Sequence, residues 1–268
     1  MFNKISIIGC GLIGSSILRA VEEKKLASKI SAYDKSSKVT DYIKKNFSVE
    51  TCNNISDVVK DSDLVIIASP LSSYKEILLS IQSNLKKNTI LTDTGSAKKE
   101  VNKIISNLNL KDINWIASHP IAGTEYSGPE AGFSSLFQNR WCILSADEKA
   151  SKDKIKALEN FWIKLGCKTK IMSFEDPFLV IDSIKSIFPD WEPEFDPERL
   201  SFPAVIDSQE ISGKVETIDY LLSILRDSRI LDTTMDAMTM NSGKNKVSFS
   251  LSRQSASVGK ASFVLKGE

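Results

Sequence analysis

Along the first 172 residues, short apolar runs alternate with stretches that repeat a hydrophobic residue every three or four positions. The runs are typical of buried parallel strands, and the repeats are typical of amphipathic helices. The predicted strands are residues 4–8, 29–33, 63–68, 89–93, 114–118, 140–144 and 167–172, and the predicted helices are residues 15–21, 73–85, 101–108 and 152–165. This alternation predicts an α/β domain over residues 1–172, with a doubly wound, mostly parallel Rossmann sheet.

The pattern changes after residue 172, so we expect residues 173–268 to form a second, smaller α+β region. Three prolines between residues 188 and 197 exclude a continuous helix there, and this segment is predicted to be a linker or an irregular arm. Helical spacing returns over residues 214–225 and 230–240. Residues 246–252 and 260–266 alternate like the strands of a β-hairpin, with residues 255–259 as the predicted connection.

The composition is that of a globular protein, with 41% hydrophobic and 26% charged residues among 268. The formal net charge is +1 and the lysines are scattered, so neither nucleic acid nor a membrane surface is expected as a partner. The four cysteines lack the spacing of a zinc site, and no metal is expected. Without a signal-peptide pattern or an apolar run that could span a bilayer, a cytoplasmic location is expected.

The first predicted strand leads into a Gly-x-Gly-x-x-Gly turn at Gly9, Gly11 and Gly14, and a predicted helix follows directly. In a dinucleotide site the first glycine permits the tight turn and the second lets the backbone approach the pyrophosphate. The third lets the helix pack closely on the strand. The N-terminus of that helix, which is the positive end of the helix dipole, then faces the phosphates. Leu12 and Ile13 lie between these glycines and complete the predicted cofactor-binding turn.

Asp34 ends the second predicted strand about 20 positions after the glycine turn, where a carboxylate can bond the adenosine ribose hydroxyls. Its charge repels a 2′-phosphate and so favours NAD over NADP, although Lys35 and Lys38 could soften that preference. An ordinary turn aspartate is the alternative interpretation. Open α/β sheets bind ligands at the edge where the third predicted strand ends, and two further cofactor contacts are predicted there, at Ser69 and Pro70.

Three motifs, at residues 9–16 (GCGLIGSS), 92–98 (TDTGSAK) and 119–129 (HPIAGTEYSGP), resemble the prephenate and arogenate dehydrogenase family in their type and order. The resemblance covers the predicted dinucleotide-binding part of the chain. It implies a small-molecule substrate, prephenate or arogenate, and NAD-dependent oxidative decarboxylation of that substrate in tyrosine biosynthesis.

The chemistry implied by this resemblance needs a proton acceptor. Prephenate carries a ring hydroxyl on the carbon that gives up hydride, and decarboxylation then makes the ring aromatic. His119, the only histidine of the chain, is predicted to accept the hydroxyl proton because its ordinary pKa is near 6.5. Ser96 is expected to offer its hydroxyl to the substrate, or to cap a helix, and both roles can coexist. Thr124 and Glu125 match family positions that line the substrate pocket, although Glu125 also fits a surface acid paired with a lysine.

The second half of the chain departs from the family, whose helical domain forms the dimer and supplies a substrate-binding arginine and further histidines. No histidine follows His119 here. Three interpretations therefore stay open. The chain is an NAD-dependent prephenate or arogenate dehydrogenase with a different tail, another Rossmann hydroxyacid dehydrogenase, or a nucleotide-binding or interaction protein without turnover. Hydroxyacid dehydrogenases usually rely on a catalytic lysine, which the placement of His119 disfavours. A homo-oligomer is compatible with each of the three.

Overall fold

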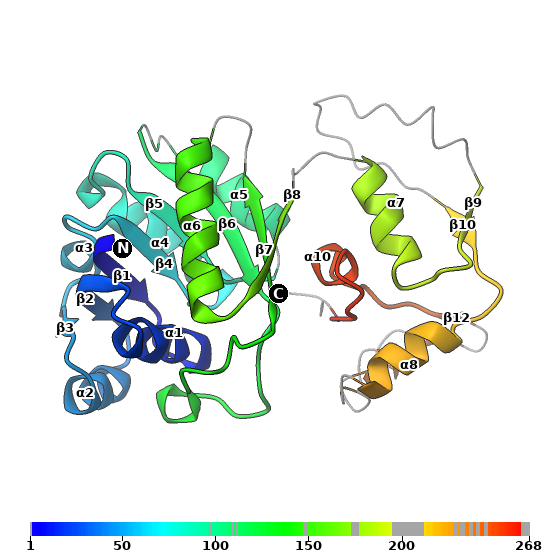
Figure 1. Cartoon of the computed structure of the whole chain (residues 1–268), viewed down its shortest axis with the longest axis horizontal. Helices are drawn as coiled ribbons and strands as arrows, with labels where there is room; N and C mark the ends of the chain where they lie inside the picture. Colours follow the sequence, from blue (N-terminus) through cyan, green and yellow to red (C-terminus); the bar gives the residue numbers. More distant parts are fainter. Residues whose placement is uncertain are drawn as a thin grey trace. The chain divides into compact units, whose positions relative to one another are not determined.

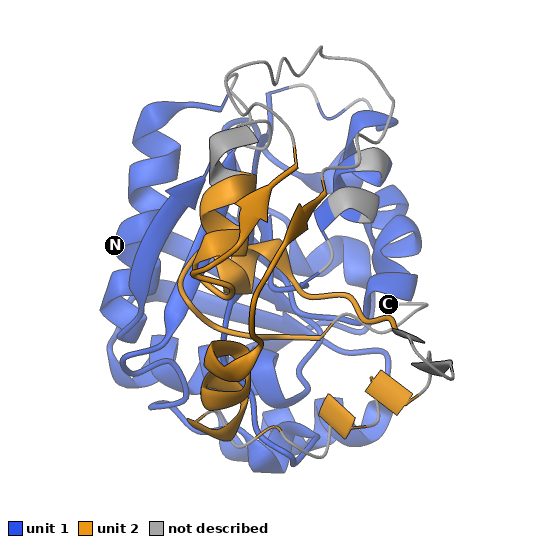
Figure 2. Ribbon diagram, turned by 90° about the vertical axis from the view of Figure 1, so that its right-hand side faces the viewer, with its two compact units in different colours: residues 1–174 blue, residues 175–268 orange. Residues whose placement is uncertain are grey.

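The computed structural model describes residues 2–96, 98–108, 110, 112–146, 150–172, 177–194, 212–227, 230, 234–235, 238–239, 242–243 and 246–263. The chain divides into two compact units, Met1–Phe174 and Glu175–Glu268 (Figure 2). Within the described ranges, none of the helices combines the length and the apolar character needed to cross a membrane.

The first unit is built on an eight-stranded sheet with the order β3-β2-β1-β4-β5-β6-β7-β8. The strands are β1 (Phe2–Ile8), β2 (Ala27–Tyr33), β3 (Glu50–Thr51), β4 (Leu64–Ile67), β5 (Ile90–Asp93), β6 (Asn114–Pro120), β7 (Trp141–Ala146) and β8 (Lys168–Met172). Neighbouring strands are parallel except β6 and β7, which are antiparallel. The order of the first six strands is that of a Rossmann sheet, so the predicted fold class is confirmed.

Helices cover both faces of this sheet (Figure 1). They are α1 (Leu12–Glu23), α2 (Ser37–Asn46), α3 (Ile55–Val58), α4 (Tyr74–Ile81), α5 (Lys98–Ser106) and α6 (Lys152–Leu165), with the 3-10 turns η1 (Leu71–Ser73), η2 (Gln82–Asn84) and η3 (Pro129–Ala131). In β4, Leu64 and Ile66 belong to the core that contains α1 and α6, whereas Val65 and Ile67 belong to the core that contains α4. The sequence of the strand is one continuous apolar run because both of its faces are buried.

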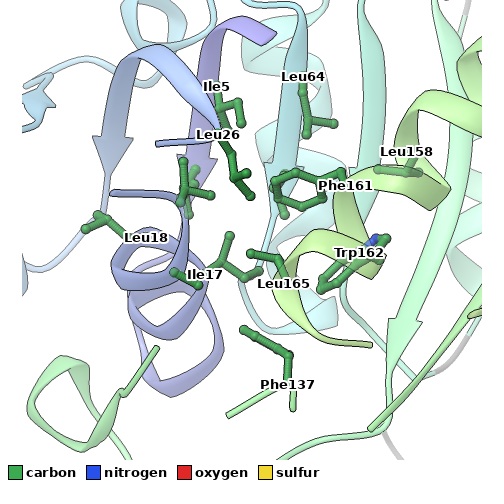
Figure 3. Close-up of a cluster of buried hydrophobic side chains, with 14 of the residues drawn as sticks. Ile5, Ile17, Leu18, Leu26, Leu64, Phe137, Leu158, Phe161, Trp162 and Leu165 are labelled. Atoms are coloured by element: carbon green, nitrogen blue, oxygen red, sulfur yellow. The ribbon is translucent and has the colours of Figure 1, made fainter. Parts of the chain in front are cut away.

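The core between the sheet and helices α1 and α6 is rich in aromatic rings (Figure 3). The ring of Trp162 packs edge-on against Phe161 at 5.6 Å and against Phe137 at 5.7 Å between centroids. Trp162 is fully buried, and its indole Nε1 donates a hydrogen bond to Ser118 Oγ at 3.1 Å. Helix α6 is thereby attached to the end of β6, where the candidate site lies.

Two features of this unit were not predicted. The segment between β2 and β4 forms α2, β3 and α3, and α2 buries only Ile43, so its hydrophobic pattern is weak. The reversal of β7 relative to β6 was also missed, because the periodicity of a strand does not encode its direction.

The second unit contains short helices and two small antiparallel pairs of strands. The helices are α7 (Pro177–Lys185), α8 (Asp219–Asp227) and α10 (Arg253–Ala256). The pairs are β9 (Glu192–Pro193) with β10 (Gly213–Lys214), and β11 (Ser242–Gly243) with β12 (Lys246–Val247). Its own core includes Ile187, Leu221 and Leu225. This content agrees with the predicted smaller α+β region.

The detailed prediction for the second region was partly wrong. The proline-rich segment contains β9, which pairs with residues 213–214, and helix α8 begins only at Asp219. Residues 255–259 do not form a hairpin connection: α10 and a turn occupy them, with the Ser252 side chain capping Ser255 N. Within the described residues, the flanking segments meet at one antiparallel bridge, Leu251 with Phe263, and positions 264–266 of the second predicted strand lie outside them. The predicted helical piece at 230–240 lies largely outside the described residues.

Candidate cofactor and active site

The turn between β1 and α1 requires glycine at two positions for reasons internal to the chain. Gly9 has a φ of +88°, a backbone angle that residues with a side chain rarely adopt, and a Cβ there would lie 2.5 Å from Ser69 Oγ. A Cβ on Gly14 would overlap the carbonyl oxygen of Gly9. These contacts bring the first turn of α1 directly against the end of β1.

Gly11 differs from the other two glycines because a Cβ there would meet no atom within 4 Å. Helix α1 starts next to it, with Gly11 as its N-cap, without a side-chain cap and without an acidic residue in its first turn. The N–H groups at that end are therefore open to an external anion, which the helix dipole also favours. The residues of this turn, including Leu12 and Ile13 in the first turn of α1, fit the pyrophosphate of a dinucleotide.

Asp34 directly follows β2, at the same edge of the sheet as the glycine turn. Its Oδ2 accepts a hydrogen bond from Cys10 N at 2.8 Å, and its Oδ1 accepts one from Ser36 N at 2.9 Å. The bond to Ser36 is the local turn that the alternative interpretation expected. The bond to Cys10 adds a link to the glycine turn, and the role of Asp34 toward the ribose stays a prediction. Burial, and then the nearby Asp34 charge, raise the pKa of Cys10 to about 12, so its thiol stays protonated.

The residues after β4 complete this part of the edge. Ser69 is half-buried and its Oγ donates to the carbonyl oxygen of Ile8 at 3.3 Å, which holds it against the glycine turn. Pro70 is exposed and precedes the 3-10 turn η1. The structure thus brings the predicted cofactor residues of β1, β2 and β4 together.

The predicted catalytic residues come from the next two strands. Ser96 is exposed and follows β5 by three positions. His119 is 7% exposed and lies inside β6, paired with Ile143 of β7. The sequence had placed His119 just beyond the strand, whereas the ladder with β7 extends through Pro120. Because β4, β5 and β6 are parallel neighbours, both residues lie at the edge that carries the glycine turn.

A buried ion pair that was not predicted from the sequence connects these two strand ends. Lys98 Nζ lies 2.6 Å from both carboxylate oxygens of Asp93 and 2.5 Å from the carbonyl oxygen of Ser118. Asp93 also accepts hydrogen bonds from Tyr74 Oη at 3.3 Å and from Gly95 N at 3.2 Å. Both charged residues lie within the TDTGSAK motif at residues 92–98. A lysine this close to an apolar strand was the feature of the sequence that could have indicated a buried ion pair.

Burial determines the titration of the groups around this pair. It lowers the pKa of Lys98, an effect that the adjacent Asp93 carboxylate opposes. It raises the pKa of Tyr74, and the Asp93 charge acts in the same direction. Tyr74 therefore serves as a neutral hydrogen-bond donor to Asp93.

Thr124 and Glu125 lie in the exposed loop after β6. The Thr124 hydroxyl accepts from Tyr126 N at 3.2 Å and donates to Tyr126 O at 3.3 Å, which forms a local turn. The loop returns to α1, where Phe133 N donates to Ser16 Oγ at 3.1 Å. The recorded contacts of Thr124 are thus within its own loop, and its predicted role toward a substrate stays a prediction. Among the described residues, no group of His, Cys, Asp and Glu is arranged to hold a metal ion.

Comparison with known proteins agrees with this arrangement. Residues 17–171, more than half of the chain, match the family model described as "Prephenate dehydrogenase, nucleotide-binding domain". Cyclohexadienyl dehydrogenase of Zymomonas mobilis is 37% identical over 176 residues, which cover 65% of this chain and 60% of that protein. Prephenate dehydrogenase of Lactococcus lactis is 30% identical over 167 residues, which cover 62% of this chain and 47% of that protein.

A solved structure shares the fold. The prephenate dehydrogenase of Aquifex aeolicus, in complex with hydroxyphenyl propionate and NAD+, superposes with a TM-score of 0.61 at 21% identity. The superposition covers 91% of this chain and 72% of that one. The matched part of the chain spans about half to three fifths of the length of the two curated relatives. From the match of its nucleotide-binding domain, we conclude that the chain belongs to the prephenate dehydrogenase family.

Proposed function

We propose that this protein is an NAD-dependent dehydrogenase that oxidatively decarboxylates prephenate or arogenate. In this proposal residues 1–172 bind the dinucleotide and carry the catalytic residues, and residues 173–268 form a second region without an assigned role. The names of the curated relatives support the reaction class, and the A. aeolicus protein binds NAD+ and a hydroxyphenyl compound. The reaction belongs to tyrosine biosynthesis, and we keep the predicted cytoplasmic location.

One observation carries the proposal. His119 and Ser96 come from the ends of the parallel neighbours β6 and β5, at the edge of the sheet that also carries the open glycine turn. In Rossmann sheets this edge holds the dinucleotide, so a group at the ends of β5 and β6 belongs to the substrate side of the same crevice.

The roles of the residues follow from their chemistry. The amides at the start of α1 would hold the pyrophosphate, and the Asp34 carboxylate would bond the ribose hydroxyls. NAD, when bound, supplies the acceptor for the hydride. His119 accepts the proton of the substrate hydroxyl, because the unprotonated nitrogen of a neutral imidazole can act as a general base. Ser96 donates a hydrogen bond that orients the substrate, and Thr124 and Glu125 line the pocket.

The decisive experiment mixes the purified protein with NAD and either prephenate or arogenate, and follows the absorbance of the reduced cofactor. Turnover of either substrate supports the proposal, and the ratio of the two kcat/KM values identifies the preferred one. NAD binding without turnover of either substrate would contradict the proposal. It would favour the alternative of a nucleotide-binding or interaction protein without turnover.

A further inference from the structure

The buried ion pair between Lys98 and Asp93 is close to both predicted catalytic residues: Lys98 bonds the residue before His119, and Ser96 lies between Asp93 and Lys98 in the chain. Asp93 is fully buried, Lys98 is 7% exposed, and their atoms approach to 2.6 Å. An ammonium group has three N–H donors, and here it has three acceptors: the two oxygens of Asp93 and the carbonyl oxygen of Ser118. Its donors are thus engaged inside the protein, so Lys98 is poorly suited to bind a substrate itself.

The pair joins three segments of backbone at this edge. Asp93 is the last residue of β5, Lys98 is the first residue of α5, and Ser118 immediately precedes His119 in β6. Ser96 lies in the short connection between Asp93 and Lys98. One side chain therefore sets the position of the backbone next to both predicted catalytic residues.

Backbone pairing holds each strand end on its outer side, β5 to β4 through Asp93 and β6 to β7 through Pro120, but it does not hold the two ends to each other. The described register between β5 and β6 consists of Ile90 with Asn114 and Leu91 with Trp115, both before the strand ends. Beyond it, Ser118 N donates to Asp93 Oδ1 at 3.3 Å. Thr92 Oγ1 and Ser118 Oγ share a further hydrogen bond at 2.7 Å. Side chains, with Lys98 at their centre, thus hold the two strand ends together.

A contribution to the stability of the fold does not by itself explain why the chain has this buried ion pair. Removing two charges from water is costly, and a hydrophobic pair of similar volume often stabilises a fold as well or better. Another Lys–Asp pair of this sheet, Lys86 with Asp63, lies at the opposite edge with side chains 39% and 29% exposed. The buried pair is therefore better explained by the geometry that it imposes.

We propose that Lys98 is a positioning residue that holds His119 and Ser96 in the relative geometry needed for proton transfer. This inference rests on the function proposed above. Lys98 acts through Asp93 and the Ser118 carbonyl and does not touch the substrate. Because a displacement of about 1 Å can lower a rate about 100-fold, its loss should affect kcat far more than KM.

The test replaces both charges together, as Lys98→Met with Asp93→Asn, so that no buried charge is left without its partner. The matched control is Lys86→Met with Asp63→Asn at the opposite edge. The Lys98 double variant should lose about 100-fold in kcat, while KM and the NAD dissociation constant stay within a few-fold of wild type. The control should keep kcat at the wild-type level.

A second measurement does not need turnover. His119 is the only histidine of the chain, so its imidazole Hε1 proton gives one unambiguous NMR resonance. This resonance should shift in the Lys98 double variant and stay in place in the control. If the wild type turns over neither substrate, the proposed function fails, and the resonance together with NAD binding still decides the role of Lys98.

Three outcomes would overturn the inference: an unchanged kcat, an unchanged His119 resonance, or a loss of NAD affinity that parallels the loss of kcat, because the last indicates general disruption. If this double variant does not fold, Lys98→Gln with Asp93→Asn provides the same two measurements. It removes both charges and keeps hydrogen-bonding groups on both side chains, so the same three outcomes apply to it.

Discussion

The carbonyl oxygen of Gly9 occupies the space in which a Cβ atom on Gly14 would lie. Helix α1 can approach the end of β1 only because residue 14 has no side chain. The same contact orients the first turn of α1, whose uncapped N–H groups form the proposed phosphate site. Strand packing and cofactor binding therefore depend on one pair of residues.

Alanine substitutions should separate packing from binding within this turn. Gly14→Ala should lower the free energy of unfolding by about 1–3 kcal/mol, because the methyl group overlaps backbone that cannot move freely. Gly11→Ala meets no atom within 4 Å, so it should keep wild-type stability and yet weaken NAD binding. Urea unfolding and isothermal titration with NAD measure the two effects. Full NAD affinity in Gly11→Ala would contradict the proposed pyrophosphate site.

Replacing His119 tests the proposed base. His119→Asn keeps a similar size but cannot take up the proton, so kcat should fall about 100- to 10,000-fold, with NAD affinity nearly unchanged. Ser96→Ala should be milder, because it removes one hydrogen bond worth about 1 kcal/mol. Steady-state kinetics with the preferred substrate measure both variants. If His119→Asn retains full activity in a protein whose wild type is active, another group accepts the proton.

The Asp34 carboxylate should make NAD bind more tightly than NADP. Asp34→Asn removes the charge that repels a 2′-phosphate, so the preference should weaken; its one amide oxygen can keep the bond from Cys10 N, whereas the bond from Ser36 N is lost. Isothermal titration with both cofactors measures the ratio of dissociation constants. Tighter binding of NADP to the wild type would assign cofactor choice to the exposed Lys35 and Lys38 instead.

Acid should destabilise the protein partly through Asp63. Burial by itself raises the pKa of this carboxyl, but hydrogen bonds from Lys86, Asn3 N and Lys4 N lower it overall. A carboxyl whose pKa is lower in the folded state adds stability above its unfolded pKa, near 3.9, and that stability is lost as the pH falls through the folded pKa. Urea unfolding between pH 6 and about pH 2.5 should therefore show a shallower loss for Asp63→Asn than for wild type. Equal slopes would exclude this contribution.

The sequence by itself determined the fold class, and it indicated the residues that we propose as carriers of the chemistry in the first unit. Continuous apolar runs such as Leu64–Ile67 identify strands buried on both faces, and glycines at fixed spacing identify a turn in which a side chain does not fit at Gly9 or Gly14. These are local constraints, because the period of burial and the conformation of a turn are set by a few neighbouring residues. The weakly patterned α2 and the direction of β7 were missed for the same reason.

Only the tertiary structure decided which of these residues meet. Lys98 and Ser118 are 20 positions apart, and nothing local in the sequence predicts that the ammonium of one bonds the carbonyl of the other. The contact exists because β5 and β6 are neighbours in the sheet and α5 begins at Lys98, shortly after the end of β5. Likewise, Asp34 reaches Cys10 N because β2 pairs with β1, so the tertiary fold turns a common turn residue into part of the candidate site.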